Sequence, residues 1–178
     1  TLGALVQSNF GRRPQLRIAG VPVGREIQAP LPRLPRSARP TGDRLDPGPH
    51  GDGSIVVLVA TDAPLLPSQL GPLAKRASLG LGRVGSIAAT SSGDLFLAFS
   101  TANRSRYGAR RLRRFDALPT ETLDPLFEAT VESVEEAIVN ALVAARPMTG
   151  VGGAYLPALP HAALQETLAR FGRLSDRS

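Results

Sequence analysis

Two short apolar segments stand out because they carry hydrophobic side chains at successive positions rather than at every second one. The first is Ser54–Thr61 and the second is Leu95–Ser100. Strands that are apolar on both faces are typical of the buried centre of a sheet. Between them, residues 67–84 place apolar side chains at intervals of three and four, which predicts an amphipathic helix. We therefore expect a mixed α/β fold in which helices cover a sheet.

The N-terminal residues predict a β-hairpin. Residues 2–10 form a strand-like run, and Gln15–Ala19 alternates polar and apolar side chains, as half-buried strands do. Gly11 and Pro14 lie between the two segments, and both residue types favour turns. We expect these two strands to pair with each other.

Two further helices are predicted in the C-terminal part. The longer one covers residues 120–145, with Thr120 as its N-cap, acidic residues in its first turns and Pro147 beyond its end. Its apolar stripe consists of Leu123, Leu126, Phe127, Val131, Val134, Ile138 and Leu142. A turn is expected at residues 150–153, and residues 160–171 form a shorter helix that stops at Gly172.

Residues 29–53 differ in composition from the segments around them. They contain six Pro and four Gly in 25 residues and show no apolar periodicity, which predicts a linker. A long segment without regular structure inside a compact domain generally has a use. This one ends directly before the most strand-like segment of the chain. A second loop, Arg104–Phe115, is basic and is expected to be solvated or to contact another subunit.

The composition removes several classes of function. The chain has no Cys, which excludes disulfides, thiol catalysis and cysteine-bound metals. Its two His residues, His50 and His161, lie far apart without ligand spacing, so we expect no metal site. No apolar run approaches the roughly 18 residues that span a bilayer, so we expect no membrane insertion. The net charge of +6 is spread along the chain and aromatic residues are only 4%, so we expect no nucleic-acid binding.

The chain starts at Thr1 without Met, and residues 2–6 already resemble a strand. We expect that an N-terminal part of the gene product is missing from this sequence, and that this part could carry half of an active site. No signal peptide is visible. The expected compartment is the cytoplasm, with a periplasmic or secreted location left open.

The chemistry most worth testing lies at the Gly53–Ser54 peptide bond. If that bond breaks, Ser54 gains a free α-amine beside its hydroxyl. Because an α-amine has an ordinary pKa of about 7.7–8.0, it can accept a proton near neutral pH. One residue would then supply both nucleophile and base. A serine at the start of a strand is also a common structural residue, and composition alone does not separate the two interpretations.

The order of motifs along the chain resembles the L-aminopeptidase/D-Ala-esterase family, also called the D-stereospecific or β-peptidyl aminopeptidase family. The motifs are Leu-Val-Gln-Ser-Asn-Phe-Gly-Arg-Arg (residues 5–13), Gly-Val-Pro-Val-Gly (20–24), Gly-Ser-Ile-Val (53–56), Thr-Asp-Ala-Pro-Leu (61–65) and Ser-Gly-Asp-Leu-Phe-Leu-Ala-Phe-Ser (92–100). The match runs, with gaps, over most of residues 2–155.

The resemblance implies a four-layered α/β/β/α fold of the N-terminal-nucleophile-hydrolase type, which is incomplete in this chain. It implies a precursor that cuts itself into two subunits and forms homo-oligomers. Residues 1–53 would end the large subunit, and residues 54–178 would form the small one. The implied activity is the removal of N-terminal residues from small peptides, amides or esters, without a cofactor.

The resemblance also implies roles for four residues. Ser54 would be the nucleophile, Ser92 would relay or orient its proton, and Asp94 would hold Ser92 or the substrate amine. Asn9 would donate its side-chain amide to the developing oxyanion. Ser92 and Asp94 are also residues that any β-turn prefers, and Asn9 beside Gly11 could be a turn residue.

Two other functions remain open on the sequence. Ornithine acetyltransferases resemble this architecture and cleave themselves, but they use threonine where this chain has Ser54. The chain could also be a catalytically inactive basic binding module, for which salt-sensitive binding to DNA or RNA would be the sign.

Overall fold

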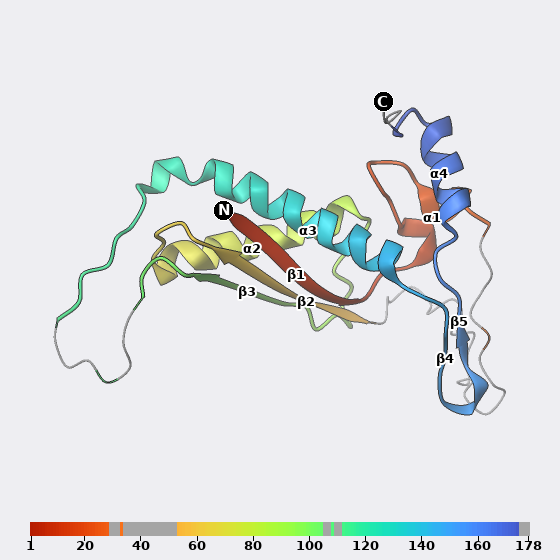
Figure 1. Ribbon diagram of the computed structural model, residues 1–178, viewed down its shortest axis with the longest axis horizontal. Helices are drawn as coiled ribbons and strands as arrows, with labels where there is room; N and C mark the ends of the chain where they lie inside the picture. The colour runs from red at the N-terminus through yellow and green to blue at the C-terminus, as the bar shows by residue number, and fades with distance from the viewer. Residues whose placement is uncertain (29–32, 34–52, 105–107, 109–111, 175–178) are drawn as a thin grey trace.

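A three-stranded mixed sheet forms the centre of the computed structural model, which describes residues 1–28, 33, 53–104, 108 and 112–174 (Figure 1). The strands are β1 (Leu2–Asn9), β2 (Ser54–Thr61) and β3 (Leu95–Ser100), in the order β1-β2-β3. β1 pairs antiparallel with β2, and β3 pairs parallel with it. β2 is therefore the central strand, as the sequence predicts. The second segment predicted to be a buried central strand, β3, lies instead at the edge of the described sheet, with Leu95, Leu97 and Phe99 exposed.

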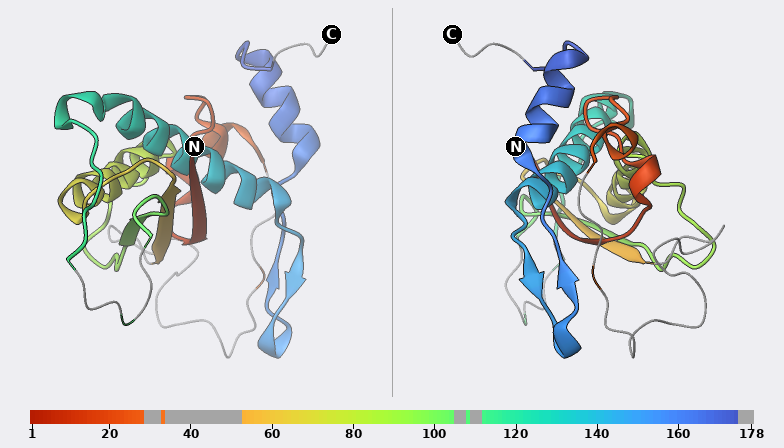
Figure 2. Two further views of the ribbon diagram at one scale, coloured as in Figure 1. Left: turned by 60° about the vertical axis from the view of Figure 1, so that its left-hand side comes forward. Right: turned by 90° about the vertical axis from the view of Figure 1, so that its right-hand side faces the viewer.

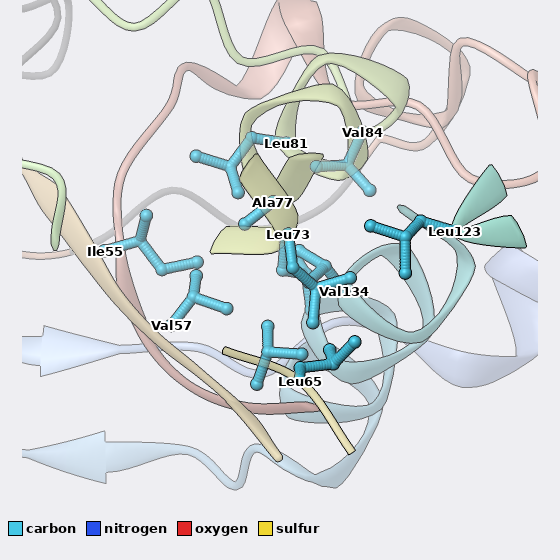
Figure 3. Packing of buried hydrophobic residues seen from close by; sticks show 11 residues of the cluster. Ile55, Val57, Leu65, Leu73, Ala77, Leu81, Val84, Leu123 and Val134 are labelled. Carbon is cyan, nitrogen blue, oxygen red and sulfur yellow. The ribbon is translucent and has the colours of Figure 1, made fainter. Parts of the chain in front are cut away.

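Two helices cover one face of this sheet. α2 (Pro67–Arg83) connects β2 to the parallel strand β3, and α3 (Asp124–Ala144) packs against α2 and β1. Both helices lie on the same side of the strands (Figure 2). The core lies between the sheet and the two helices (Figure 3). It is formed by Ile55, Val57 and Val59 of β2, Leu73, Ala77 and Leu81 of α2, and Val134 and Ile138 of α3. The predicted helical stripes point into this core.

The opposite face of the sheet, here called the outer face, is left uncovered by the elements that the structure describes. Its positions are Gly3, Leu5, Gln7, Asn9, Ser54, Val56, Leu58, Ala60, Leu95, Leu97 and Phe99. Leu5 is 68% exposed, Leu95 64% and Leu97 56%. A sheet with one apolar face buried under helices normally presents polar residues on the other. The outer face of this sheet is instead largely apolar.

The predicted N-terminal hairpin is wrong. Residues 2–9 do form a strand, but its partner is β2 and not Gln15–Ala19. After β1 the chain makes a 3₁₀ turn, Arg13–Gln15, and a short helix, α1 (Val23–Glu26). Ile18 and Val23 are buried in a second apolar cluster with Leu164 of the C-terminal helix. Residues 15–19 therefore contribute to this cluster, and β1 pairs with β2, with which it forms a longer ladder.

The C-terminal part follows the sequence prediction with one correction at the start of its long helix. Thr120 does not cap α3, because residues 120–122 form a separate 3₁₀ turn and Leu123 occupies the N-cap position. The expected turn at residues 150–153 joins a two-stranded hairpin of β4 (Met148–Thr149) and β5 (Tyr155–Leu156). α4 (His161–Arg170) then packs beside α1.

The predicted linker lies outside the described residues except for Arg33 and Gly53, and the basic loop Arg104–Phe115 is described only in part. Within the described part of the chain, no helix has the length and apolar character needed to cross a membrane.

The contact between α2 and α3 depends on a glycine. A Cβ atom at Gly80 would lie 2.8 Å from the backbone oxygen of Val131 and 2.9 Å from the side chain of Val134. Replacing Gly80 with Ala in the complete protein is expected to lower the free energy of unfolding by about 1–3 kcal/mol, because the helices must move apart. Denaturant unfolding measures this effect. Gly82→Ala is the control, since its Cβ would meet nothing within 4 Å and alanine favours the helix. Equal stability of the two variants would contradict the close packing.

Candidate active site

Ser54 is the first residue of the central strand, and its hydroxyl is held from the neighbouring turn. The backbone N–H of Gly93 donates a hydrogen bond of 2.9 Å to Ser54 Oγ. Gly93 belongs to the turn that enters β3, the parallel neighbour of β2. A hydroxyl oxygen that accepts this bond keeps its own proton free for another acceptor. The same N–H stabilises negative charge on Oγ if that proton leaves.

Asn9 lies opposite Ser54 on the adjacent strand. The two residues are direct partners at the end of the β1–β2 ladder. Because directly opposed residues of antiparallel strands point to the same face, both side chains lie on the outer face, with Cβ atoms about 4.5–5.5 Å apart. The Asn9 side chain is exposed and forms no hydrogen bond with the described residues. Its amide group is therefore available to a molecule that reaches Ser54.

Asp94 fixes the backbone directly after the serine. Its Oδ1 accepts a hydrogen bond of 3.0 Å from the backbone N–H of Ile55. The turn before β3 thus holds β2 twice, through the hydroxyl of Ser54 and through the next peptide N–H. The resemblance assigns Asp94 to Ser92 or to a substrate amine; within the described part of the chain its hydrogen bond is to the Ile55 N–H and not to Ser92.

Ser92 lies in the same turn without a direct bond to the nucleophile. Its backbone N–H donates to the carbonyl of Ala89 over 2.8 Å. Ser92 and Asp94 together line a cavity of about 430 Å³, and Ser92 also lines a much smaller cavity with Gly53. The turn therefore brings Ser92 to the same end of the sheet as Ser54.

Gly53, the residue before the serine, can hardly be anything but glycine. Its φ is +109°, a backbone conformation that residues with a side chain rarely adopt. A Cβ atom there would lie 1.9 Å from the backbone oxygen of Asn9. The Gly53–Ser54 bond is thus held in an unusual conformation at the end of the β1–β2 ladder.

Sequence reasoning missed two contributors to this site. The Gly93 N–H acts through its backbone, so residue type gives no sign of it. Arg12 lines the small cavity with Gly53 and a larger one of about 380 Å³ with Asn9. Its Nε and Nη2 atoms are buried and have no hydrogen-bond partner among the described residues. Burying part of a guanidinium without a partner is costly, and this sign of function is visible only in the structure and not in the sequence.

Among the described residues, no three His, Asp or Glu side chains gather in a way that could hold a metal ion. The chemistry that the described groups can supply is that of a hydroxyl nucleophile with N–H donors around it. Such a group attacks carbonyl carbon when a base takes its proton.

Comparison with known proteins places this geometry in a family. The chain is 46% identical to the β-peptidyl aminopeptidase BapA of Sphingosinicella microcystinivorans over 179 residues, covering 98% of this chain and 44% of that protein. It is 42% identical to BapA of Sphingosinicella xenopeptidilytica, covering 97% of this chain and 43% of that protein. The chain thus spans less than half the length of the curated relatives it matches.

Solved structures agree with the fold. The PH0078 protein of Pyrococcus horikoshii matches with a TM-score of 0.79 at 45% identity, covering 97% of this chain and 43% of that one. The L-aminopeptidase D-Ala-esterase/amidase of Ochrobactrum anthropi matches with a TM-score of 0.74 at 35% identity, covering 97% of this chain and 49% of that one. The latter is described as a prototype of the serine aminopeptidases with a variant of the Ntn-hydrolase fold. Residues 1–156 match the model of peptidase family S58. This chain therefore belongs to peptidase family S58.

Proposed function

We propose that the chain is the C-terminal portion of a self-processing serine aminopeptidase that releases N-terminal residues from small peptides, amides or esters. One observation carries the proposal: Ser54 stands at the end of the central strand with its Oγ bonded to the Gly93 N–H and with Asn9 opposite. The glycine before it, whose positive φ brings the backbone close to Asn9, supports cleavage at this bond. The two BapA relatives are named as aminopeptidases, which favours this function over acetyl transfer.

The first proposed reaction is self-cleavage. Ser54 Oγ attacks the carbonyl carbon of Gly53, the C–N bond breaks, and the departing nitrogen takes a proton to become the Ser54 α-amine. The resulting ester is hydrolysed by one water, which restores the hydroxyl and leaves a carboxylate on Gly53. Glycine adopts the positive φ of residue 53 without steric cost, and this conformation lets the scissile bond lie close against the backbone of Asn9.

The second proposed reaction is turnover of substrate. The freed α-amine of Ser54 takes the hydroxyl proton, and Oγ attacks the substrate carbonyl to form an acyl-enzyme. The amine or alcohol leaves with a proton, and water then releases the acyl group. The Gly93 N–H stabilises the charge on Oγ as its proton departs, and Asp94 keeps the start of β2 in position. Ser92 is proposed to relay that proton, because it directly precedes Gly93 in the turn before β3.

Asn9 is the proposed oxyanion donor, because its side chain shares the outer face with Ser54. Replacing Asn9 with Ala in the complete protein is expected to lower kcat by about 10²–10³-fold, the cost of losing one such donor. Steady-state hydrolysis of an alanine p-nitroanilide measures this effect. Asn140→Ala, at an exposed asparagine of α3 on the helix-covered side of the sheet, should leave kcat within about twofold, as a residue outside the oxyanion site should. An unchanged kcat for Asn9→Ala would remove Asn9 from the mechanism.

The remainder of the protein is proposed to complete the fold. The outer face is apolar and exposed, and the relatives are more than twice as long as this chain. A second sheet packed there, with helices beyond it, would give the four-layered α/β/β/α sandwich that the resemblance implies. Ser54 and Asn9 would then lie between the two sheets, where further catalytic groups can reach them.

Intact-mass spectrometry of the complete gene product, purified under mild conditions, tests the proposal. The expected result is a fragment that begins at Ser54, with its partner fragment ending at Gly53. A chain that stays in one piece on prolonged incubation and hydrolyses no alanine p-nitroanilide would overturn the proposal, because Ser54 would then remain blocked as an amide.

A further inference from the structure

We propose that Arg12 is a carboxylate-binding residue of the mature site, and that its ligand is an α-carboxylate. The nearest source is the new C-terminus that self-cleavage creates on Gly53; the other is the free C-terminus of a short peptide substrate. This inference rests on the proposed function, because both carboxylates exist only if the chain processes itself or accepts peptides.

The state of the Arg12 guanidinium motivates the proposal. Nε and Nη2, two donors of the planar fork, are buried and have no partner among the residues that the structure describes. Other arginines in the described part have acceptors: Arg17 bonds the carbonyl of Gly20, and Arg170 bonds Glu26. A guanidinium is always charged, so burying it without an anion or acceptor is unfavourable. The described part of the site therefore lacks an acceptor for these two donors, and a carboxylate is the acceptor that best matches a charged guanidinium.

The position of Arg12 identifies where that group should be. Arg12 and Gly53 line the same cavity, which holds only about 20 Å³, together with Phe10 and Ser92. Gly53 itself packs against the backbone of Asn9 and Phe10, three and two residues before the arginine. A charge that appears on Gly53 is thus created beside two unpaired N–H donors.

Cleavage supplies this carboxylate with a balanced reaction. Hydrolysis of the Gly53–Ser54 bond consumes one water and converts a neutral peptide into a carboxylate and an amine, with the carboxyl proton lost to solvent near neutral pH. A guanidinium binds a carboxylate through two parallel N–H···O bonds, which fixes both position and orientation. Arg12 would hold the Gly53 end against the body of the protein and away from the freed amine of Ser54.

A substrate carboxylate can satisfy the same donors. The larger cavity of about 380 Å³ is lined by Arg12 and the Asn9 position, but also by Ile138 of the helix-covered side, and Ser54 does not line it. A peptide whose scissile carbonyl lies at the Asn9 amide on the outer face would therefore have to bend round the end of β1 to place its C-terminus at Arg12, which makes the substrate the less favoured source. In this case the enzyme would favour short peptides with a free C-terminus over their amides.

The experiment uses the complete protein and three variants: Arg12→Met, which keeps the aliphatic stem; Arg12→Lys, which keeps the charge but not the fork; and Arg17→Met, an exposed arginine that lines neither cavity. Self-cleavage by intact mass and turnover of alanine p-nitroanilide, which has no carboxylate, are recorded for each protein. These two readouts test the proposed function independently of Arg12.

Carboxypeptidase treatment distinguishes the first source. If Arg12 holds the Gly53 carboxylate, the large fragment of the wild type and of Arg17→Met should keep Gly53, and Arg12→Met should be trimmed about tenfold faster, as loss of a bidentate pair exposes the end. Arg12→Lys should be intermediate. If Arg12→Met does not fold, Arg12→Lys carries the test.

Alanyl-alanine and its C-terminal amide distinguish the second source. If Arg12 binds the substrate carboxylate, the wild type should prefer the acid, and Arg12→Met should raise KM for the acid alone by about tenfold. A cleaved, active protein in which Arg12 variants change neither the trimming rate nor the acid-to-amide ratio would overturn this inference and leave the proposed function intact. An uncut protein without turnover would overturn both, because neither carboxylate would be present.

Discussion

Replacing Ser54 with Ala in the complete protein is expected to leave the precursor in one piece and to lower turnover by a factor on the order of 10⁶. Alanine has no oxygen to attack the Gly53 carbonyl, so no α-amine is freed, and no acyl-enzyme can form on a methyl group. Intact mass and the hydrolysis of alanine p-nitroanilide measure the two losses in the same preparation.

The matched control for this variant is Ser68→Ala. Ser68 lies exposed in the first turn of α2, which begins beyond the far end of β2 from Ser54. Cleavage and turnover at wild-type rates are expected for it. If the uncut Ser54→Ala protein hydrolysed the substrate at the wild-type rate, the nucleophile would have to be another residue. Asn9 would then also lose its proposed role as oxyanion donor.

Replacing Gly53 with Ala is expected to slow self-cleavage by at least about 10²-fold, the scale of loss that follows from a misplacement of about 1 Å at a reacting centre. Two effects combine. An alanine at φ +109° is strained, and its Cβ would lie 1.9 Å from the backbone oxygen of Asn9, which cannot move without breaking the end of the ladder. The fraction of cleaved chain against time, followed by mass spectrometry, gives the rate.

Gly82→Ala provides the comparison for this change. Gly82 lies exposed in α2, away from the outer face, and a Cβ there would meet nothing within 4 Å. It should process like the wild type. Processing of Gly53→Ala at the wild-type rate would show that the positive-φ conformation of residue 53 is not needed for the acyl shift.

The parts of the fold that the sequence predicts well are those with local patterns. β2, α2, β3 and α3 lie within a few residues of their predicted bounds, because each carries its own periodicity over a full element. The predicted hairpin failed because strand pairing is not local: β1 pairs with a strand that begins 45 residues after its own end. Thr120 failed as a cap because residues 120–122 form a separate 3₁₀ turn after Pro119, which moves the N-cap of α3 to Leu123.

The candidate site was also predicted only in part. Ser54, Asn9, Ser92 and Asp94 could be selected from motifs, and the structure brings them to one end of the sheet. Their contacts could not be predicted, since the Gly93 N–H and the Ile55 N–H are backbone groups that any residue carries. Arg12 could not be selected either, because its interest comes from burial without a partner and not from its residue type.

The uncovered outer face bears on how this chain behaves when it is made alone. A contiguous apolar surface in contact with water drives self-association, and the unpaired edges of β1 and β3 beside it could template strand pairing between copies. A recombinant protein limited to these residues should therefore bind hydrophobic dyes, elute as aggregates and need detergent to stay dispersed. Measurements on Ser54 therefore require the complete protein, in which this face is proposed to be covered.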